Sequence, residues 1–196
     1  MNKNYEDRPV RPLSQTYYRD GTKYHEQRIE GMRVVAASLD DDMLVKIGDK
    51  INEANNVFVA ALGRSRLNIM AFATRLCQLG ISTHVVGDNS TPSIHRGDLF
   101  IIGSSSGRTS SLVEFAKKAK AVDAEIVLFT EAAESPIGDL STLVYHLTAD
   151  ESKLPEGLGW YAEYGINLCY ESLVMYLQKK RGVTNEEMQD KLANLY

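Results

Sequence analysis

The sequence of 196 residues has few of the side chains that form metal centres and disulfides, with two cysteines and four histidines. Cys77 and Cys169 both fall in helical apolar patterns, and they form neither a metal-type cluster nor a disulfide framework. We therefore expect two buried, reduced thiols and no bound metal. No apolar run reaches membrane length, and the first residues lack the apolar stretch of a signal peptide. These absences favour a cytoplasmic protein without a membrane partner.

An excess of positive charge is also missing, because the formal net charge is −4. A nucleic acid or an anionic membrane would need a broad basic surface, and none is expected here. A negatively charged ligand would therefore have to be held by local hydrogen-bond donors. Hydrophobic residues make up 43% of the chain, which is ordinary for a globular protein and allows one domain with a single core.

The chain alternates short apolar runs with amphipathic helical patterns. Residues 1–22 are polar and contain Pro9 and Pro12, which predicts a mobile arm ahead of a single domain, residues 23–196. The apolar runs are typical of strands buried on both faces of a sheet. Strands are expected at residues 57–62, 83–86, 99–102, 125–129 and 143–147. Helices are expected at residues 24–37, from about 41 past 51, at 65–79, 110–121 and 159–180, and from 185.

This alternation predicts an α/β fold, a three-layer sandwich with a parallel sheet covered by helices on both sides. Right-handed crossovers bring the strand-to-helix loops to the carboxyl edge of the sheet, where ligands bind in open α/β sheets. Loops with unusual composition follow the expected strands at Gly63–Ser65, Ser104–Ser110 and Thr130–Pro136.

Residues 104–111 combine six hydroxyl side chains with Gly107, between a buried strand and a helix expected from Ser110. The first amides of a helix lack intrahelical partners and its dipole favours negative charge, so the pattern predicts a phosphate site. Serine and threonine also cap helices without any ligand, but one cap needs a single hydroxyl. The expected phosphate-binding residues are Ser104, Ser106, Gly107, Arg108, Thr109 and Ser110.

Gly63, Arg64 and Ser65 occupy the equivalent position after the first expected strand. Ser65 is either a helix cap or a ligand-binding hydroxyl. Arg64 is either a surface charge or a guanidinium that pairs with phosphate or holds a loop. We include all three among the candidate substrate-binding residues.

These motifs resemble one family when they are read in order. They are Gly63-Arg64-Ser65, Leu79-Gly80, Val85-Val86-Gly87, Thr91-Pro92, Gly97-Asp98-Leu99, the serine-rich loop, Ser135-Pro136, Leu158-Gly159 and Ala193-Asn194-Leu195. The chain resembles the SIS (sugar isomerase) domain family from about residue 57 to residue 196, and within it the 6-phospho-3-hexuloisomerases.

The resemblance implies a five-stranded parallel sheet flanked by helices, of flavodoxin-like or Rossmann-like type, assembled as a homodimer or homotetramer. It implies the interconversion of 3-hexulose 6-phosphate and fructose 6-phosphate, a step of the ribulose monophosphate route. A phosphorylated sugar is then the partner, and neither a metal nor an organic cofactor is expected.

Moving a carbonyl from C3 to C2 requires a base and donors for the developing oxyanion. The family carries a glutamate at the position of Glu163, which would be the base; otherwise Glu163 is a solvent-facing helix residue, as most glutamates are. This chain departs from the family by having Arg108 for a loop glutamate, and Gln78 and Leu192 for histidines. His95 is a candidate replacement proton carrier. These departures leave two alternatives open, a non-catalytic phosphosugar sensor and an isomerase of a pentose or heptose phosphate.

Overall fold

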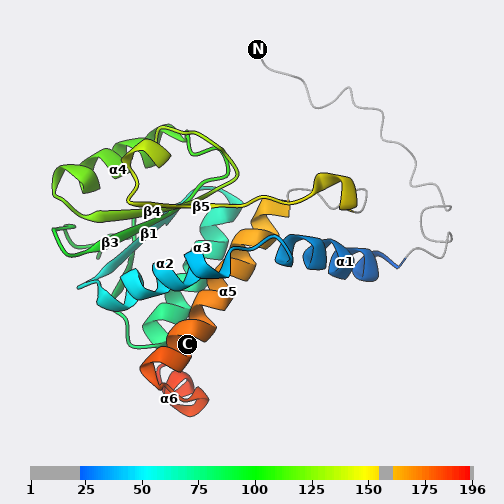
Figure 1. The fold of residues 1–196 in the computed structure, drawn as a ribbon. Helices are drawn as coiled ribbons and strands as arrows, with labels where there is room; N and C mark the ends of the chain where they lie inside the picture. Colours follow the sequence, from blue (N-terminus) through cyan, green and yellow to red (C-terminus); the bar gives the residue numbers. More distant parts are fainter. Residues whose placement is uncertain (1–22, 155–160, 195–196) are drawn as a thin grey trace, which may run out of the picture.

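The computed structural model describes residues 23–154 and 161–194. It contains one parallel sheet of five strands in the order β2-β1-β3-β4-β5 (Figure 1). The strands are β1 (Val57–Ala61), β2 (Thr83–Val85), β3 (Leu99–Gly103), β4 (Glu125–Thr130) and β5 (Leu143–His146). The expected fold class is confirmed, and the expected strand bounds agree with the structure to within one residue.

Helices cover both faces of the sheet. They are α1 (Tyr24–Ala36), α2 (Asp41–Glu53), α3 (Arg64–Gln78), α4 (Ser110–Ala121), α5 (Tyr161–Arg181) and α6 (Asn185–Asp190), with short 3₁₀ turns η2 (Gly138–Leu140) and η3 (Glu151–Lys153). The layer with α2, α3 and α5 lies on one face and α4 lies on the other, while α1 runs beside α5 and projects from the body (Figure 1). The expected arm, residues 1–22, and the expected start of α5 at Gly159 lie outside the described residues.

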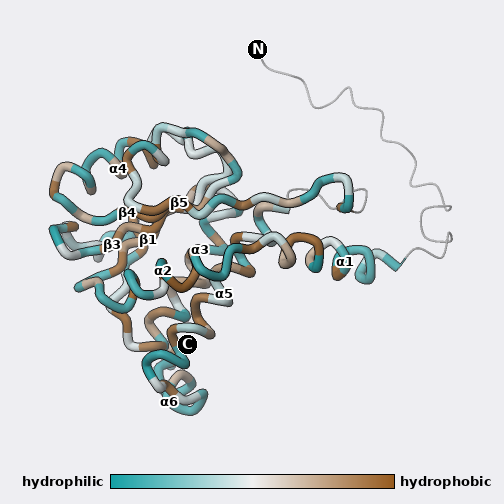
Figure 2. The backbone as a smooth tube through the Cα atoms, viewed as in Figure 1, coloured by the Kyte–Doolittle hydropathy of each residue, from teal (hydrophilic) through white to brown (hydrophobic). Residues whose placement is uncertain are grey.

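Alternation along the strands divides the core into two clusters. In β1, Val57, Val59 and Ala61 face α2, α3 and α5, whereas Phe58 and Ala60 face the α4 layer. The central strands are mostly brown in Figure 2, and every residue of β1 and β3 is buried. This burial explains why continuous apolar runs predicted strands rather than amphipathic helices.

One expectation about burial is wrong. Cys169 on α5 is buried, but Cys77 on α3 is exposed. Ile69, Phe72 and Leu76 form the inner face of α3, and Cys77 lies on the outer face beside them. Helical periodicity shows which stripe of a helix is apolar, but it does not tell whether a cysteine at the edge of that stripe is buried or exposed. Among the described residues, no helix is long and apolar enough to cross a membrane.

Candidate active site

Three loops follow neighbouring strands at the carboxyl edge of the sheet. The Arg64 loop (Gly63–Ser65) follows β1, the serine loop (Ser104–Thr109) follows β3, and the Glu131 loop (Thr130–Pro136) follows β4. Because β1, β3 and β4 are parallel and adjacent, their ends bring these loops together. The strand order also reverses between β1 and β3, which is the place where ligands bind in such sheets.

The serine loop leaves the start of α4 open to a ligand. Thr109 is the N-cap residue of α4, yet its side chain makes no capping hydrogen bond, and the first turn contains no acidic residue. The Thr109 hydroxyl instead lies 3.5 Å from the hydroxyl of Ser104, which is buried. Ser106 accepts a hydrogen bond of 3.3 Å from the amide of Arg108, and Ser110 is exposed. The hydroxyls and free amides therefore offer donors to an anion.

Gly107 is the point at which the serine loop meets the Glu131 loop. Its φ is +58°, and a Cβ there would lie 2.1 Å from the Oγ of Ser135. Its amide is 3.2 Å from the Ser104 hydroxyl, and its carbonyl accepts from the amide of Ile137 at 3.2 Å. Only glycine fits this conformation and this space, so the residue fixes the shape of the loop.

Arg108 extends toward the neighbouring loop. Its guanidinium donates a hydrogen bond of 3.0 Å to the carbonyl of Glu134. The side chain is exposed and ties the serine loop to the Glu131 loop. An arginine can pair directly with a phosphate, but here the Arg108 contact stabilises the loop that carries the hydrogen-bond donors.

Arg64 and Glu163 form an ion pair at the carboxyl edge of the sheet. The Nε of Arg64 lies 3.0 Å from one carboxylate oxygen of Glu163, and its second guanidinium nitrogen lies 2.7 Å from the other. Asn68 donates to the backbone carbonyl of Glu163 at 3.3 Å. The Glu163 side chain is only 16% exposed, against 78% for Arg64. The ion pair thus joins the first turn of α3 to the first turn of α5. The Glu163 carboxylate also balances the positive charge of Arg64, which the dipole disfavours at the N-terminus of α3.

Gly63, with a φ of +59°, directs the chain from β1 into α3, and Ser65 in the first turn is half-buried. The structure thus places Arg64, Ser65 and Glu163 at the same edge of the sheet as all the expected residues of the serine loop.

His95 is not brought to this group within one chain. It precedes β3, and its amide donates to the carboxylate of Asp98 at 2.8 Å. The serine loop begins at the other end of β3, about 16 Å away for a strand of this length. Gln78 is buried at the far end of α3, about 20 Å from the first turn, and it accepts a hydrogen bond of 3.0 Å from Arg75. A side chain at either position meets this site only if it comes from another subunit.

Sequence reasoning did not single out Glu131, the first residue after β4. Its amide donates to the carbonyl of Ser105 at 3.1 Å, so it lies against the serine loop. Burial raises the pKa of its carboxyl group, and Glu151 adds to the shift. The pKa of Tyr161, the first residue of α5, is raised by burial and then by Glu131 and Glu151. The sequence could have identified Glu131 as a candidate site residue, because it is an acidic residue directly after a buried strand.

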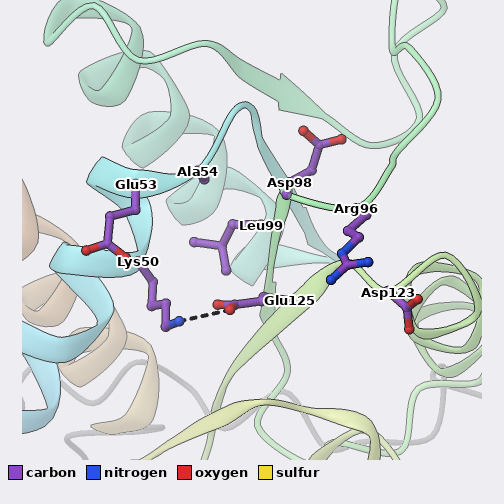
Figure 3. Close-up of a pocket in the computed structure, with 9 residues that line it drawn as sticks. Lys50, Glu53, Ala54, Arg96, Asp98, Leu99, Asp123 and Glu125 are labelled. Atoms are coloured by element: carbon purple, nitrogen blue, oxygen red, sulfur yellow. Dashed lines mark hydrogen bonds and ion pairs between the residues drawn. The ribbon is translucent and has the colours of Figure 1, made fainter.

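A cavity of about 550 Å³ lies at the amino edge of the sheet (Figure 3). Lys50 of α2 and Glu125 of β4 point toward each other there and form an ion pair of 2.8 Å. Its charged lining has two basic side chains, Lys50 and Arg96, and four acidic ones, Glu53, Asp98, Asp123 and Glu125. This negative balance disfavours a phosphate ligand.

Comparison with known proteins places the chain in a family. The sequence model of the SIS domain matches residues 50–164. A 3-hexulose-6-phosphate isomerase of Bacillus subtilis is 33% identical over 181 residues, which cover 89% of this chain and 98% of that protein. A protein of the same name from Methanocaldococcus jannaschii is 42% identical over 148 residues, covering 75% and 81%.

A solved structure from Methanococcus jannaschii, for which the molecular function of 3-hexulose-6-phosphate isomerase was inferred, has a similar fold. The TM-score is 0.77 at 25% identity, and the superposition covers 89% of this chain and 100% of that one. Sequence and fold agree, and the chain belongs to the SIS domain family.

Proposed function

We propose that this protein is a phosphosugar isomerase that interconverts 3-hexulose 6-phosphate and fructose 6-phosphate. The observation that carries the proposal is a partly buried carboxylate, Glu163, held at the same sheet edge as the open N-terminus of α4. The names and the identity of the Bacillus subtilis and Methanocaldococcus jannaschii relatives support this substrate pair. The reaction would serve the ribulose monophosphate route.

We infer that the serine loop holds the phosphate of the sugar. The hydroxyls of Ser104, Ser106, Thr109 and Ser110, together with the first amides of α4, are the donors. The absence of a side-chain cap and of acidic residues in the first turn of α4 supports this assignment. Arg108 supports the loop from outside through the Glu134 carbonyl. The loop glutamate of related sequences is then unnecessary for phosphate binding.

We infer that Glu163 moves the carbon-bound proton. Its carboxylate takes the proton from C2 of 3-hexulose 6-phosphate, and the electron pair forms the C2–C3 double bond while O3 becomes negative. O3 gains a proton as O2 loses one through the enediol. Glu163 then returns its proton to C3, which leaves the carbonyl at C2. Atoms and charge balance, and no cofactor is consumed.

Arg64 has two successive roles in this scheme. In the free protein it binds both oxygens of Glu163 and orients the carboxylate. When Glu163 becomes protonated its charge is lost, so the guanidinium is available to stabilise the enediolate oxygen. A substrate oxygen must replace one of the two hydrogen bonds before Glu163 acts as a base.

We also infer that the protein is a homodimer or homotetramer. Leu67 and Met70 on the outer face of α3 are 68% and 38% exposed, and Met175 on α5 is 71% exposed. A second copy that packs on this face would remove these side chains from water. A Leu67→Lys, Met175→Lys double variant is expected to lower the mass measured by light scattering, whereas an unchanged mass would remove this face from the interface.

The experiment that tests the function is incubation with 3-hexulose 6-phosphate and detection of fructose 6-phosphate by ¹³C NMR. Pentulose and heptulose phosphates are supplied in parallel. Turnover of the hexulose alone is the expected result. Binding of fructose 6-phosphate without turnover of any sugar would instead identify a phosphosugar sensor.

A further inference from the structure

Thr130 is the last residue of β4, and its fully buried side chain contacts the serine loop. Its hydroxyl donates a hydrogen bond of 2.9 Å to the carbonyl of Ser105 and accepts one of 3.1 Å from the amide of Ala132. The two substituents on its Cβ restrict the χ1 torsion, so the hydroxyl is held in one direction. This side chain therefore joins the middle of the serine loop to the Glu131 loop.

The carbonyl of Ser105 is held by two donors. The amide of Glu131 lies 3.1 Å from it, in addition to the Thr130 hydroxyl at 2.9 Å. Both donors belong to the carboxyl end of β4, so the carbonyl points toward β4. A trans peptide bond is planar and carries its carbonyl and its N–H on opposite sides. The amide of Ser106 belongs to the same peptide group, and it therefore points away from β4.

This direction leaves the Ser106 amide available to a ligand. Among residues 23–154 and 161–194, no backbone or side-chain oxygen accepts a hydrogen bond from it, and the residue is exposed. The side of β3 away from β4 is the side on which β1 and the Arg64 loop lie, and the strand order reverses there. The amide is thus a free donor on the side where we place the sugar.

Two other hydrogen bonds hold the serine loop, but they act later in the chain. They involve the carbonyl of Gly107 at 3.2 Å and the guanidinium of Arg108 at 3.0 Å, both after Ser106. The Arg108 side chain is exposed, whereas Thr130 is 0% exposed. Thr130 is therefore the buried side chain that sets the orientation of the peptide group between Ser105 and Ser106.

We propose that Thr130 is a positioning residue of the phosphate site, which orients this peptide group so that the Ser106 amide donates a hydrogen bond to the phosphate of the sugar. The proposal rests on the function proposed above, because it assumes that the serine loop holds a sugar phosphate. Thr130 itself does not contact the ligand. The Ser106 amide joins the hydroxyls and the first amides of α4 as a further donor.

The test is calorimetric titration of Thr130→Val with fructose 6-phosphate and, separately, with inorganic phosphate. Valine keeps the shape of the side chain and removes the hydroxyl, and Thr130→Ser restores the hydroxyl. Thr142→Val is the matched control at the amino edge, where the Thr142 hydroxyl accepts a hydrogen bond of 3.2 Å from the amide of Ile126. It loses a comparable hydrogen bond far from the serine loop.

Thr130→Val is expected to bind both ligands about tenfold more weakly, which corresponds to about one hydrogen bond. The factor should be the same for both ligands, because the loss lies in the phosphate contact. Thr130→Ser and Thr142→Val should bind within about threefold of the wild type. In turnover of 3-hexulose 6-phosphate, the loss in Thr130→Val should appear in KM and leave kcat within about twofold, because the phosphate is bound alike in ground and transition states.

Unchanged affinity of Thr130→Val for inorganic phosphate would overturn the proposal, because the hydroxyl would then serve folding alone. An equal loss in Thr142→Val would overturn it too, as an effect of general destabilisation. A loss that Thr130→Ser does not restore would show that the hydroxyl is not responsible, with the same consequence.

The wild-type protein gives a criterion that does not depend on whether Thr130→Val folds. Inorganic phosphate should shift the ¹⁵N–¹H resonance of the Ser106 amide and slow its hydrogen exchange, because a free donor becomes bonded. A Ser106 resonance that stays in place while phosphate binds would overturn the proposal. Failure of the proposed isomerase function is seen separately, as binding of fructose 6-phosphate without turnover.

Discussion

The two edges of the sheet are made from the same strands but carry different chemistry. At the carboxyl edge, loops with glycine and hydroxyl groups lead into the N-termini of α3 and α4, and the first turns of these helices have no acidic residue. At the amino edge, four acidic and two basic side chains line a cavity of about 550 Å³. A large cavity is therefore a poor guide to an anion site, and unpaired amides together with charge balance are a better one.

The largest expected difference between the edges concerns catalysis. Glu163→Gln at the carboxyl edge should lower turnover by about 10³-fold or more, because a positioned base contributes about 10²–10⁴-fold and no other described carboxylate is held by Arg64. The affinity for fructose 6-phosphate should remain. Glu125→Gln at the amino edge is the matched control and should keep its turnover. Near-normal turnover of Glu163→Gln would remove this residue from the mechanism.

Replacing one glycine by alanine at each edge of the sheet distinguishes an effect on folding from an effect on ligand binding. Gly107 and Gly97 have φ values of +58° and +90°, and a Cβ would lie 2.1 Å from Ser135 Oγ in the first case and 2.5 Å from Asn55 Nδ2 in the second. Both alanine variants should lose about 1–3 kcal/mol of unfolding free energy in urea.

Only Gly107→Ala should also lose affinity for fructose 6-phosphate, by at least about tenfold, because the amides of the serine loop would shift. Calorimetric titration of the two variants measures this difference. Equal affinity losses in both would contradict the assignment of the ligand to the carboxyl edge.

Two buried tyrosines, Tyr145 and Tyr170, differ in whether their hydroxyl groups have a hydrogen-bond partner. The Tyr170 hydroxyl has no hydrogen-bond partner among the described residues and lies 3.0 Å from the position of a Cβ on Gly103. The Tyr145 hydroxyl accepts from the amide of Asp40 at 2.7 Å. Tyr170→Phe should raise the unfolding free energy by about 1 kcal/mol and Tyr145→Phe should lower it by a similar amount. A loss of unfolding free energy in urea for Tyr170→Phe would contradict this expectation, because it would mean that the Tyr170 hydroxyl has a hydrogen-bond partner in the folded protein.

The smallest effect is expected from the ion pair of the amino edge. Lys50→Met should change the unfolding free energy by about 1 kcal/mol or less and leave turnover unchanged, because the pair is partly exposed to solvent and lies at the opposite edge of the sheet from Glu163. Glu125 raises the pKa of Lys50 above 10.5. A raised lysine pKa stabilises the fold below the pKa of the unfolded chain, so this contribution is present at neutral pH and is lost only as the pH rises above 10.5. Loss of the contribution near pH 7 in urea titrations would contradict this reading.

The strands and the three loops could be predicted because buried parallel strands are continuous apolar runs and topology brings their carboxyl ends together. The contacts between loops could not. Arg64 and Glu163 are 99 residues apart in the chain, and Arg108 and Glu134 are 26 apart. Such pairs depend on how helices pack and on where long side chains extend, and a local pattern carries neither. The exposure of Cys77 was missed for the same reason, since helical periodicity does not say what covers the outer face of α3.

The most direct test of the central claim is deuterium incorporation into fructose 6-phosphate in D₂O, followed by NMR. The account predicts exchange at C3 with the wild-type protein and none with Glu163→Gln, although both bind the sugar. Tight binding without exchange by the wild type would contradict it and favour a sensor. Exchange at C1 instead of C3 would contradict the assignment of the reaction to C2 and C3.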